Sequence, residues 1–173
     1  MKMRLMFLAL SLFSLRAMAV YNVGDPVSNL GWTDDQGQVV HLQDDGIKDT
    51  IRVLLYNAGW CGPCNNEFDE LRDQWAQFDG QPVTFISLSA QDYNHKAPDQ
   101  SFLQSWRSAH GIPANVYVAA SPNDYGSEFE TPPLYIPNVA IINRDGTLAY
   151  KATAPGADAI VQEVQSLLSS ASK

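Results

Sequence analysis

The sequence predicts an α/β protein in which a mixed central β-sheet is covered by helices on both faces. Two continuous apolar runs, Ile51–Asn57 and Val83–Ser89, have the length and composition of buried strands. Segments with helical spacing of apolar residues follow each run. The predicted order is therefore strand, helix, strand, helix, strand, followed by a β-hairpin and a closing helix.

The first half of the chain supplies a turn, a short strand, the central strand and a helix. Asp34–Gly37 predicts a turn that leads into a strand over Val39–Leu42. After the central strand, a helix is predicted from about Pro63 to Phe78, because apolar side chains recur at helical spacing: Phe68, Leu71, Trp75 and Phe78. Pro63 is tolerated near its start, where an N–H has no partner to lose.

The second half begins with the strand Val83–Ser89 and a polar loop. A helix from about Gln100 to His110 buries Phe102, Leu103 and Trp106 and ends at Gly111. The remaining predicted elements are a strand over Asn115–Ala119, an irregular surface segment over Ser121–Pro133, a hairpin of Val139–Asn143 and Leu148–Lys151, and a closing helix with Ile160, Val161, Val164, Leu167 and Leu168 on one face.

Residues 1–19 have the pattern of a secretory signal peptide. Lys2 and Arg4 precede the apolar stretch Leu5–Leu15, which is too short to span a bilayer, and Ala17-Met18-Ala19 is a small-x-small cleavage site. We expect cleavage after Ala19, a periplasmic or secreted location, and one domain over residues 20–173.

The charge of the chain argues against nucleic acid as a partner. The net charge is −8, and it becomes −11 without the signal segment, which carries three basic residues and no acidic ones. No basic cluster is present. The acidic pairs Asp34-Asp35 and Asp44-Asp45 lack EF-hand spacing, so we expect solvated turn residues there and no calcium site.

The motif Trp60-Cys61-Gly62-Pro63-Cys64 holds both cysteines of the chain. Because it follows a strand and opens a helix, it places Cys61 at a helix N-terminus, where unpaired N–H groups and the helix dipole stabilise a thiolate. Cys64 lies one turn further on and is close enough to form a disulfide with Cys61. The motif therefore predicts redox chemistry.

Two other interpretations of the pair are weaker. A zinc site needs further ligands, but there is no third cysteine, and His41, His95 and His110 are scattered. A structural disulfide over so short a loop would constrain the unfolded chain little. We expect neither a metal nor a cofactor.

Several short motifs carry a family resemblance over about Tyr21 to Leu168. They are Gly24-Asp25-Pro26, the hairpin Asp35–Val40, Trp60–Cys64, Glu67, and Ile136-Pro137 ahead of the hairpin Asn143–Leu148. With them the chain resembles the thioredoxin superfamily, and within it the exported TlpA/ResA-like, redoxin-type branch. The resemblance implies a thioredoxin-like fold with an N-terminal β-hairpin extension, and Ser87–Asn115 matches the branch's central helix–strand insert.

The resemblance also implies a substrate site around the cysteine pair. The Ile136–Pro137 bond is expected to be cis, which would expose the Ile136 backbone for pairing with an extended substrate strand. Trp60 is expected to offer partners a flat apolar contact. Gly62 and Pro63 complete the residues expected to contact substrate, whereas Trp32, Trp75 and Trp106 are interpreted as packing residues.

Glu67 is the candidate for proton transfer. It follows Cys64 by three residues, and in this branch a glutamate here is associated with proton handling. A solvated helix carboxylate is the alternative. Cytoplasmic-type thioredoxins bury an aspartate at the position of Leu55, and this branch often has a basic residue where Asn65 stands. Stabilisation of the Cys61 thiolate would then come mainly from the helix terminus.

These features predict a protein-disulfide reductase active in cell redox homeostasis. Cys61 would attack a substrate disulfide and Cys64 would resolve the product. The resemblance implies re-reduction by a membrane thiol donor of the DsbD/CcdA type, and a monomer is expected. Three alternatives stay open: a disulfide-forming oxidase, a peroxiredoxin-like peroxidase, and a Sco-like copper-binding module that would use His95 or His110.

Overall fold

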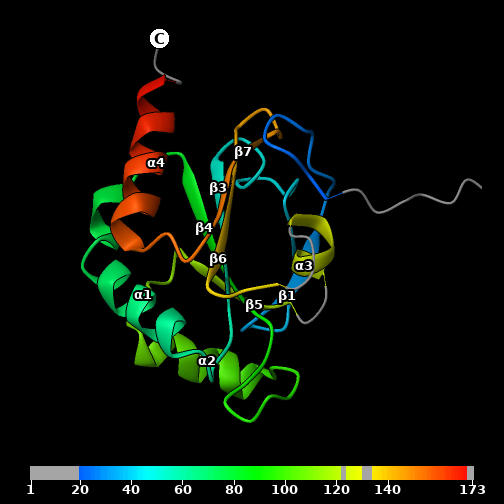
Figure 1. Ribbon diagram of the computed structural model, residues 1–173, viewed down its shortest axis with the longest axis vertical. Helices are drawn as coiled ribbons and strands as arrows, with labels where there is room; N and C mark the ends of the chain where they lie inside the picture. The colour runs from blue at the N-terminus through cyan, green and yellow to red at the C-terminus, as the bar shows by residue number, and fades with distance from the viewer. Residues whose placement is uncertain (1–19, 122–123, 130–133, 171–173) are drawn as a thin grey trace, which may run out of the picture.

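A seven-stranded sheet runs through the molecule in the order β2-β1-β5-β4-β3-β6-β7 (Figure 1). The computed structural model describes residues 20–121, 124–129 and 134–170, and the predicted signal peptide lies outside them. The strands are β1 (Gly31–Asp34), β2 (Val39–His41), β3 (Ile51–Asn57), β4 (Val83–Ser89), β5 (Tyr117–Ala120), β6 (Asn138–Ile142) and β7 (Leu148–Thr153).

The sheet is mixed, as predicted. The central strands β3, β4 and β5 are parallel, whereas β1 pairs antiparallel with β5, and β6 pairs antiparallel with β3 and β7. β1 and β2 form the N-terminal hairpin. β5 starts at Tyr117, two residues later than predicted, beside Ile86 of β4.

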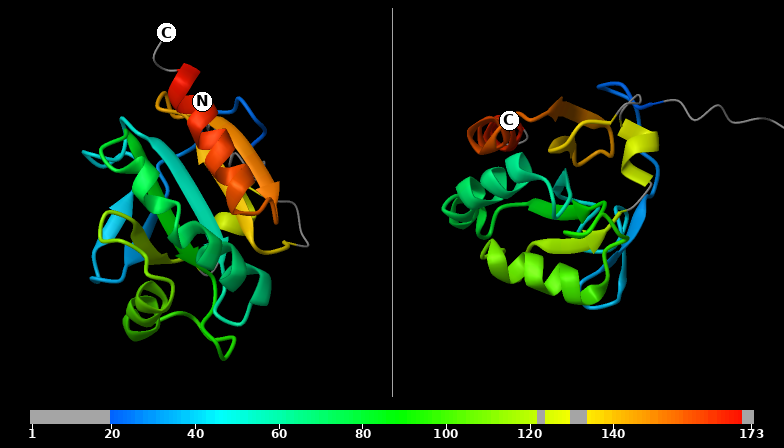
Figure 2. Two further views of the ribbon diagram at one scale, coloured as in Figure 1. Left: turned by 90° about the vertical axis from the view of Figure 1, so that its left-hand side faces the viewer. Right: turned by 60° about the horizontal axis from the view of Figure 1, so that its bottom comes forward.

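Helices lie on both faces of the sheet, which confirms the predicted fold class. α1 (Gly62–Arg72), α2 (Gln100–Ala109) and α4 (Ala157–Ser170) cover one face, and α3 (Asp124–Phe129) lies on the other (Figures 1 and 2). No helix within the described ranges is long and apolar enough to span a bilayer.

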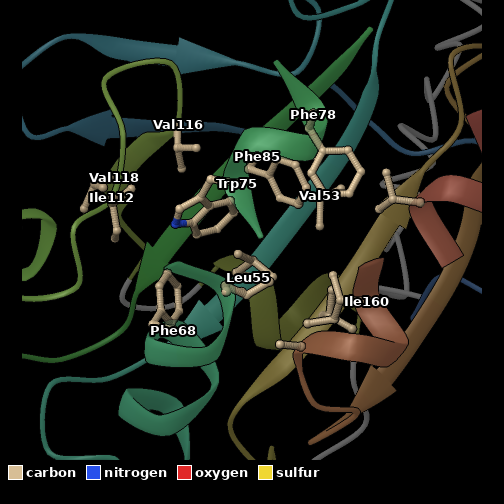
Figure 3. Close-up of a cluster of buried hydrophobic side chains, with 14 of the residues drawn as sticks. Val53, Leu55, Phe68, Trp75, Phe78, Phe85, Ile112, Val116, Val118 and Ile160 are labelled. Atoms are coloured by element: carbon tan, nitrogen blue, oxygen red, sulfur yellow. The ribbon is translucent and has the colours of Figure 1, made fainter. Parts of the chain in front are cut away.

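A hydrophobic core lies on each face of the sheet. β3 contributes side chains to both cores, because successive side chains of a strand point to opposite faces. Val53 and Leu55 join the larger core under α1, α2 and α4, and Leu54 and Tyr56 join the smaller one with α3. The larger core gathers aromatic and branched side chains from strands and helices (Figure 3): Phe68, Trp75, Phe78, Phe85, Ile112, Val116, Val118 and Ile160. This packing fixes the end of β3, from which the cysteine motif continues.

The predicted helix from Pro63 to Phe78 is in fact two elements. α1 ends at Arg72, and a 3₁₀ helix, η1, covers Trp75–Phe78. The chain tightens between them, since the N–H of Gln74 bonds the carbonyl of Leu71, three residues back. The spacing of the apolar residues does not distinguish one long α-helix from an α-helix followed by a 3₁₀ helix, because both helix types bury residues three or four positions apart.

The prediction of an irregular segment over Ser121–Pro133 was wrong within its described part, because Asp124–Phe129 form α3. Tyr125 and Phe129 of this short helix are fully buried. The Tyr125 ring stacks on Tyr56 with centroids 4.5 Å apart, and its hydroxyl donates to Oδ1 of Asn138 at 2.6 Å. Tertiary packing therefore stabilises a helix that local composition disfavours.

The acidic pair Asp34-Asp35 was predicted to be solvated, and this was also wrong. Both residues are buried. Oδ1 of Asp34 accepts the N–H groups of Gln36 and Gln38 in the hairpin turn, at 2.9 and 2.8 Å. Asp35 accepts two bonds from the guanidinium of Arg107, at 2.6 and 3.0 Å, which ties the hairpin to α2. Because Arg107 is distant from Asp35 in the sequence, no local pattern around Asp35 predicts that it is buried and paired.

Candidate active site

The cysteine pair lies where β3 gives way to α1. Cys61 is the N-cap residue of α1, and its extended backbone (φ −83°, ψ 102°) directs its sulfur back to the helix. The N–H of Cys64 donates to Sγ of Cys61 at 3.2 Å. Pro63 occupies the first turn, where no N–H is needed. The predicted thiol position at a helix N-terminus is confirmed.

Cys61 and Cys64 are joined by a disulfide, with Cα atoms 5.3 Å apart. Both cysteines are buried, Cys61 with 3% of its residue surface exposed and Cys64 with none. Nδ2 of Asn65 donates to the Cys61 carbonyl at 2.7 Å. The resemblance implies that a basic residue often stands at the position of Asn65. In this chain Asn65 instead holds the backbone of the cysteine motif through this hydrogen bond.

The Ile136–Pro137 peptide bond is cis, as expected. The half-buried Ile136 side chain packs against the cluster of Ala58, Cys61 and Cys64. The segment before β6 therefore lies directly beside the disulfide. A polypeptide strand pairing with this segment would be held alongside the cysteines.

Glu67 is buried, one turn after Cys64 on the same helix. The pKa of its carboxyl is raised to about 7, mainly by burial and to a smaller extent by the charge of Glu70, against the opposing effect of a hydrogen bond from the backbone N–H of Gly156. Its Oε2 has no hydrogen-bond partner. The solvated-carboxylate alternative is thereby wrong, and a carboxyl of this kind can accept a proton near neutral pH.

Trp60 forms an exposed wall of the site, with 44% of its surface accessible. Its Nε1 donates to Oε1 of Gln91 at 2.8 Å, and its ring stacks on that of His95 with centroids 4.9 Å apart. A groove of about 340 Å³ lies beside it and is lined by Tyr56, Trp60, Ala90, Gln91, Ala97, Leu134 and Ile136. This groove adjoins the disulfide, because Ile136 contacts both.

The loop after β4 packs tightly on the turn before the cysteines. The N–H of Gly59 donates to the carbonyl of Gln91 at 2.9 Å. A Cβ at Gly59 would lie 2.8 Å from the backbone nitrogen of Tyr93, so only glycine fits. Sequence reasoning missed Gln91 and considered His95 only as a metal ligand, not as a partner of Trp60, since contacts of a polar loop follow no periodic pattern.

A buried hydrogen-bond network underlies the motif. Nδ2 of Asn57 donates to Oγ of Ser87 at 3.0 Å, and Oγ of Ser89 donates to Oδ1 of Asn57 at 2.9 Å. Leu55, in contrast, packs in the apolar core, so it places no carboxylate below the cysteines. The polar end of an otherwise apolar strand was the available signal for Asn57.

The histidines considered for a copper site make other contacts. His95 stacks on Trp60, and Nδ1 of the buried His110 bonds Oδ1 of Asp69 at 3.0 Å. Within residues 20–121, 124–129 and 134–170, no three or more His, Cys, Asp or Glu side chains form a group that could hold a metal ion.

Known structures share the fold of this chain. A thiol:disulfide interchange protein of the thioredoxin family from Chlorobium tepidum TLS is 15% identical, with a TM-score of 0.66, and the match covers 84% of this chain and 97% of that one. A secreted thiol-disulfide isomerase from Corynebacterium glutamicum is 16% identical, with a TM-score of 0.68 and coverage of 83% and 85%. A peroxiredoxin-like protein from Aquifex aeolicus is 19% identical, with a TM-score of 0.63 and coverage of 86% and 89%.

The chain therefore has a thioredoxin-like fold, in which Cys61 and Cys64 form a disulfide at the N-terminus of α1. Residues 23–151 match the AhpC/TSA family, and the chain belongs to that family. No curated protein matches it.

Proposed function

We propose that this protein is an exported reductase of protein disulfides that cycles between a Cys61–Cys64 dithiol and disulfide. The observation that carries the proposal is the disulfide at the N-terminus of α1, beside the cis Ile136–Pro137 segment. The helix terminus supports a reactive sulfur, and the adjacent segment supports a bound polypeptide strand.

In the first step the thiolate of Cys61 attacks one sulfur of the substrate disulfide. A bond forms between Sγ of Cys61 and that sulfur, and the second substrate sulfur leaves as a thiolate that takes a proton from water. The N–H of Cys64, now aimed at Sγ of Cys61, stabilises the attacking thiolate. Ile136 and Trp60 flank the position that the substrate would occupy.

In the second step Cys64 displaces the substrate. Its thiol loses a proton to Glu67, its sulfur bonds to Sγ of Cys61, and the remaining substrate sulfur leaves as a thiolate that takes a proton from water. The substrate has then gained two electrons and two protons, and the protein is left as the disulfide. The raised pKa of Glu67 supports its role as acceptor, because a group with a pKa near ambient pH transfers protons efficiently.

The dipeptide between the cysteines supports the proposed direction of transfer. Gly62-Pro63 is the pair found in reducing thioredoxins. Their reduction potential is about −270 mV, compared with about −120 mV for the oxidant DsbA. This difference corresponds to roughly 7 kcal/mol. Export, a monomeric state and re-reduction by a DsbD/CcdA-type membrane donor complete the proposal.

A glutathione redox titration of the protein lacking residues 1–19 tests the direction. We expect a potential closer to −270 than to −120 mV, on the scale of about 30 mV for 1.4 kcal/mol. A value near that of DsbA would assign the protein to disulfide formation. A value near −270 mV, together with reduction of insulin disulfides, would support the reductase.

Peroxidase activity is the second candidate, because the chain belongs to the AhpC/TSA family and shares the fold of the Aquifex protein. The motif argues against it. Asn57-Ala58-Gly59-Trp60 precedes Cys61 in place of the Thr-x-x-Cys pattern of peroxiredoxins, so the threonine is missing. Hydrogen peroxide consumption faster than insulin reduction would favour the peroxidase.

A further inference from the structure

A second groove opens on the other side of the cis-proline segment from Trp60. It has a volume of about 230 Å³ and lies between α1 and the turn that joins β7 to α4. The helices α1 and α4 are in contact, with α4 above α1 in Figure 1. Its lining includes Pro63, Glu67, Glu70, Pro137, Ala154 and Gly156. Since Pro63 separates the two cysteines and Pro137 adjoins the strand-pairing segment, the groove is continuous with the active site.

The charged side chains lining this groove are both acidic. Glu67 lines the groove although it is only 4% exposed, and its buried Oε2 has no hydrogen-bond partner. Glu70 is exposed one turn further along α1. An unpaired buried carboxylate oxygen beside a second carboxylate is costly unless a donor or cation meets it.

We propose that this groove is a subsite for a lysine or arginine side chain of the substrate polypeptide, held by Glu67 and Glu70. The inference rests on the proposed function, since the polypeptide is the one whose disulfide faces Cys61. Pro63, Pro137 and Ala154 offer apolar surface to the long stem of such a side chain, while its charged head reaches the carboxylates.

The net charge of the chain agrees with a basic substrate. At −8 for the full sequence, the protein attracts cationic polypeptides over distances of about a Debye length. A bound cation would also favour the charged form of Glu67, against the effects of burial and of Glu70. Filling the subsite would therefore leave Glu67 ready to accept the proton of Cys64.

Peptide disulfides that differ at one residue test the subsite. A fluorogenic set would carry arginine, glutamine or glutamate at each of the two positions on either side of the cysteine. With the wild-type protein at low salt, we expect kcat/KM to favour arginine over glutamine by about five-fold at one of these positions. The preference should decrease toward unity as salt screens the charges.

Two variants of α1 separate the groove from the general charge of the helix. Glu70→Gln should remove at least half of the arginine preference. Asp73→Asn changes the net charge equally at an exposed position outside the groove and should keep the preference.

Equal kcat/KM for arginine and glutamine at every position, with the peptides still reduced, would overturn the subsite and leave the reductase standing. Equal losses in Glu70→Gln and Asp73→Asn would also overturn it. If no peptide is reduced, the proposed function fails and the subsite fails with it.

Discussion

The backbone N–H of Cys64 points at Sγ of Cys61, 3.2 Å away. This contact follows from Cys61 being the N-cap of α1, because the side chain of an N-cap residue accepts an N–H from the first turn. When the disulfide opens, the same N–H and the helix dipole face a thiolate. This local relationship is the basis for proposing Cys61 as the attacking sulfur and Cys64 as the resolving one.

Substituting either cysteine should have different effects. Cys61→Ser removes the attacking sulfur, so insulin reduction should fall to the rate without protein. Cys64→Ser leaves the first step intact and blocks the second, so the variant should accumulate as a mixed disulfide with its substrate. Mass spectrometry under non-reducing conditions measures this species. Mixed disulfides on Cys61→Ser and none on Cys64→Ser would reverse the two roles.

Replacing Glu67 should change the pH dependence of turnover. Glu67 becomes a proton-accepting carboxylate as the pH rises through its pKa of about 7, so the wild-type rate of resolution should increase across that pH. Glu67→Gln should lose this inflection and be slower by about 100-fold above it. Single-turnover release of substrate from pH 5.5 to 8.5 measures both quantities. Asp73→Asn, on the same helix, is the control, and an unchanged profile in Glu67→Gln would contradict proton transfer.

The same carboxyl should make stability depend on pH. Folding raises its pKa from 4.5 to about 7, so the folded state binds the proton more tightly. The folded state should therefore lose stability as the pH rises above 4.5, up to about 7, with little further change above that. Glu67→Gln removes this loss. The free energy of unfolding of the variant minus that of the wild type should therefore be larger at pH 8 than at pH 4, by about 2–3 kcal/mol. Urea unfolding at both pH values measures the difference, and equal differences would contradict a raised pKa.

Two glycines near the cysteines should respond oppositely to alanine. Gly59→Ala forces a Cβ to within 2.8 Å of the Tyr93 backbone, and we expect a loss of about 1–3 kcal/mol in the free energy of unfolding. Gly62 has open space at its Cβ position in the first turn of α1, so Gly62→Ala should be neutral or stabilising by about 0.5 kcal/mol. Thermal unfolding compares the pair. A tolerated Gly59→Ala would show that the loop after β4 is not packed on this turn.

The elements that dominate the fold could be predicted because their patterns are local. β3 and β4 have the predicted bounds, and the helix after the cysteines begins where the motif requires. α3 could not be predicted in this way, because Tyr125 is stabilised by Tyr56 and Asn138, which belong to other elements. A six-residue helix has too few local hydrogen bonds to be stable alone.

The residues of the candidate site also fall into two groups, those placed by local sequence and those placed by contacts distant in sequence. Cys61 and Cys64 are adjacent to a strand end and a helix start, so their placement follows from sequence. The environment of Glu67 could not be predicted, because Gly156, which donates its backbone N–H to the carboxyl and lines the same groove, is distant in sequence. The contacts of Gln91 and His95 with Trp60 were missed for the same reason, since they span a loop.

The most direct test of the account is the rate at which the reduced protein reacts with iodoacetamide as a function of pH, in the Cys64→Ser variant to isolate one sulfur. We expect a thiolate of Cys61 with a pKa below the value of about 8.5 for free cysteine, and a reaction that persists at pH 7. A titration at or above about 8.5 would show that the terminus of α1 does not activate Cys61 and would contradict the mechanism.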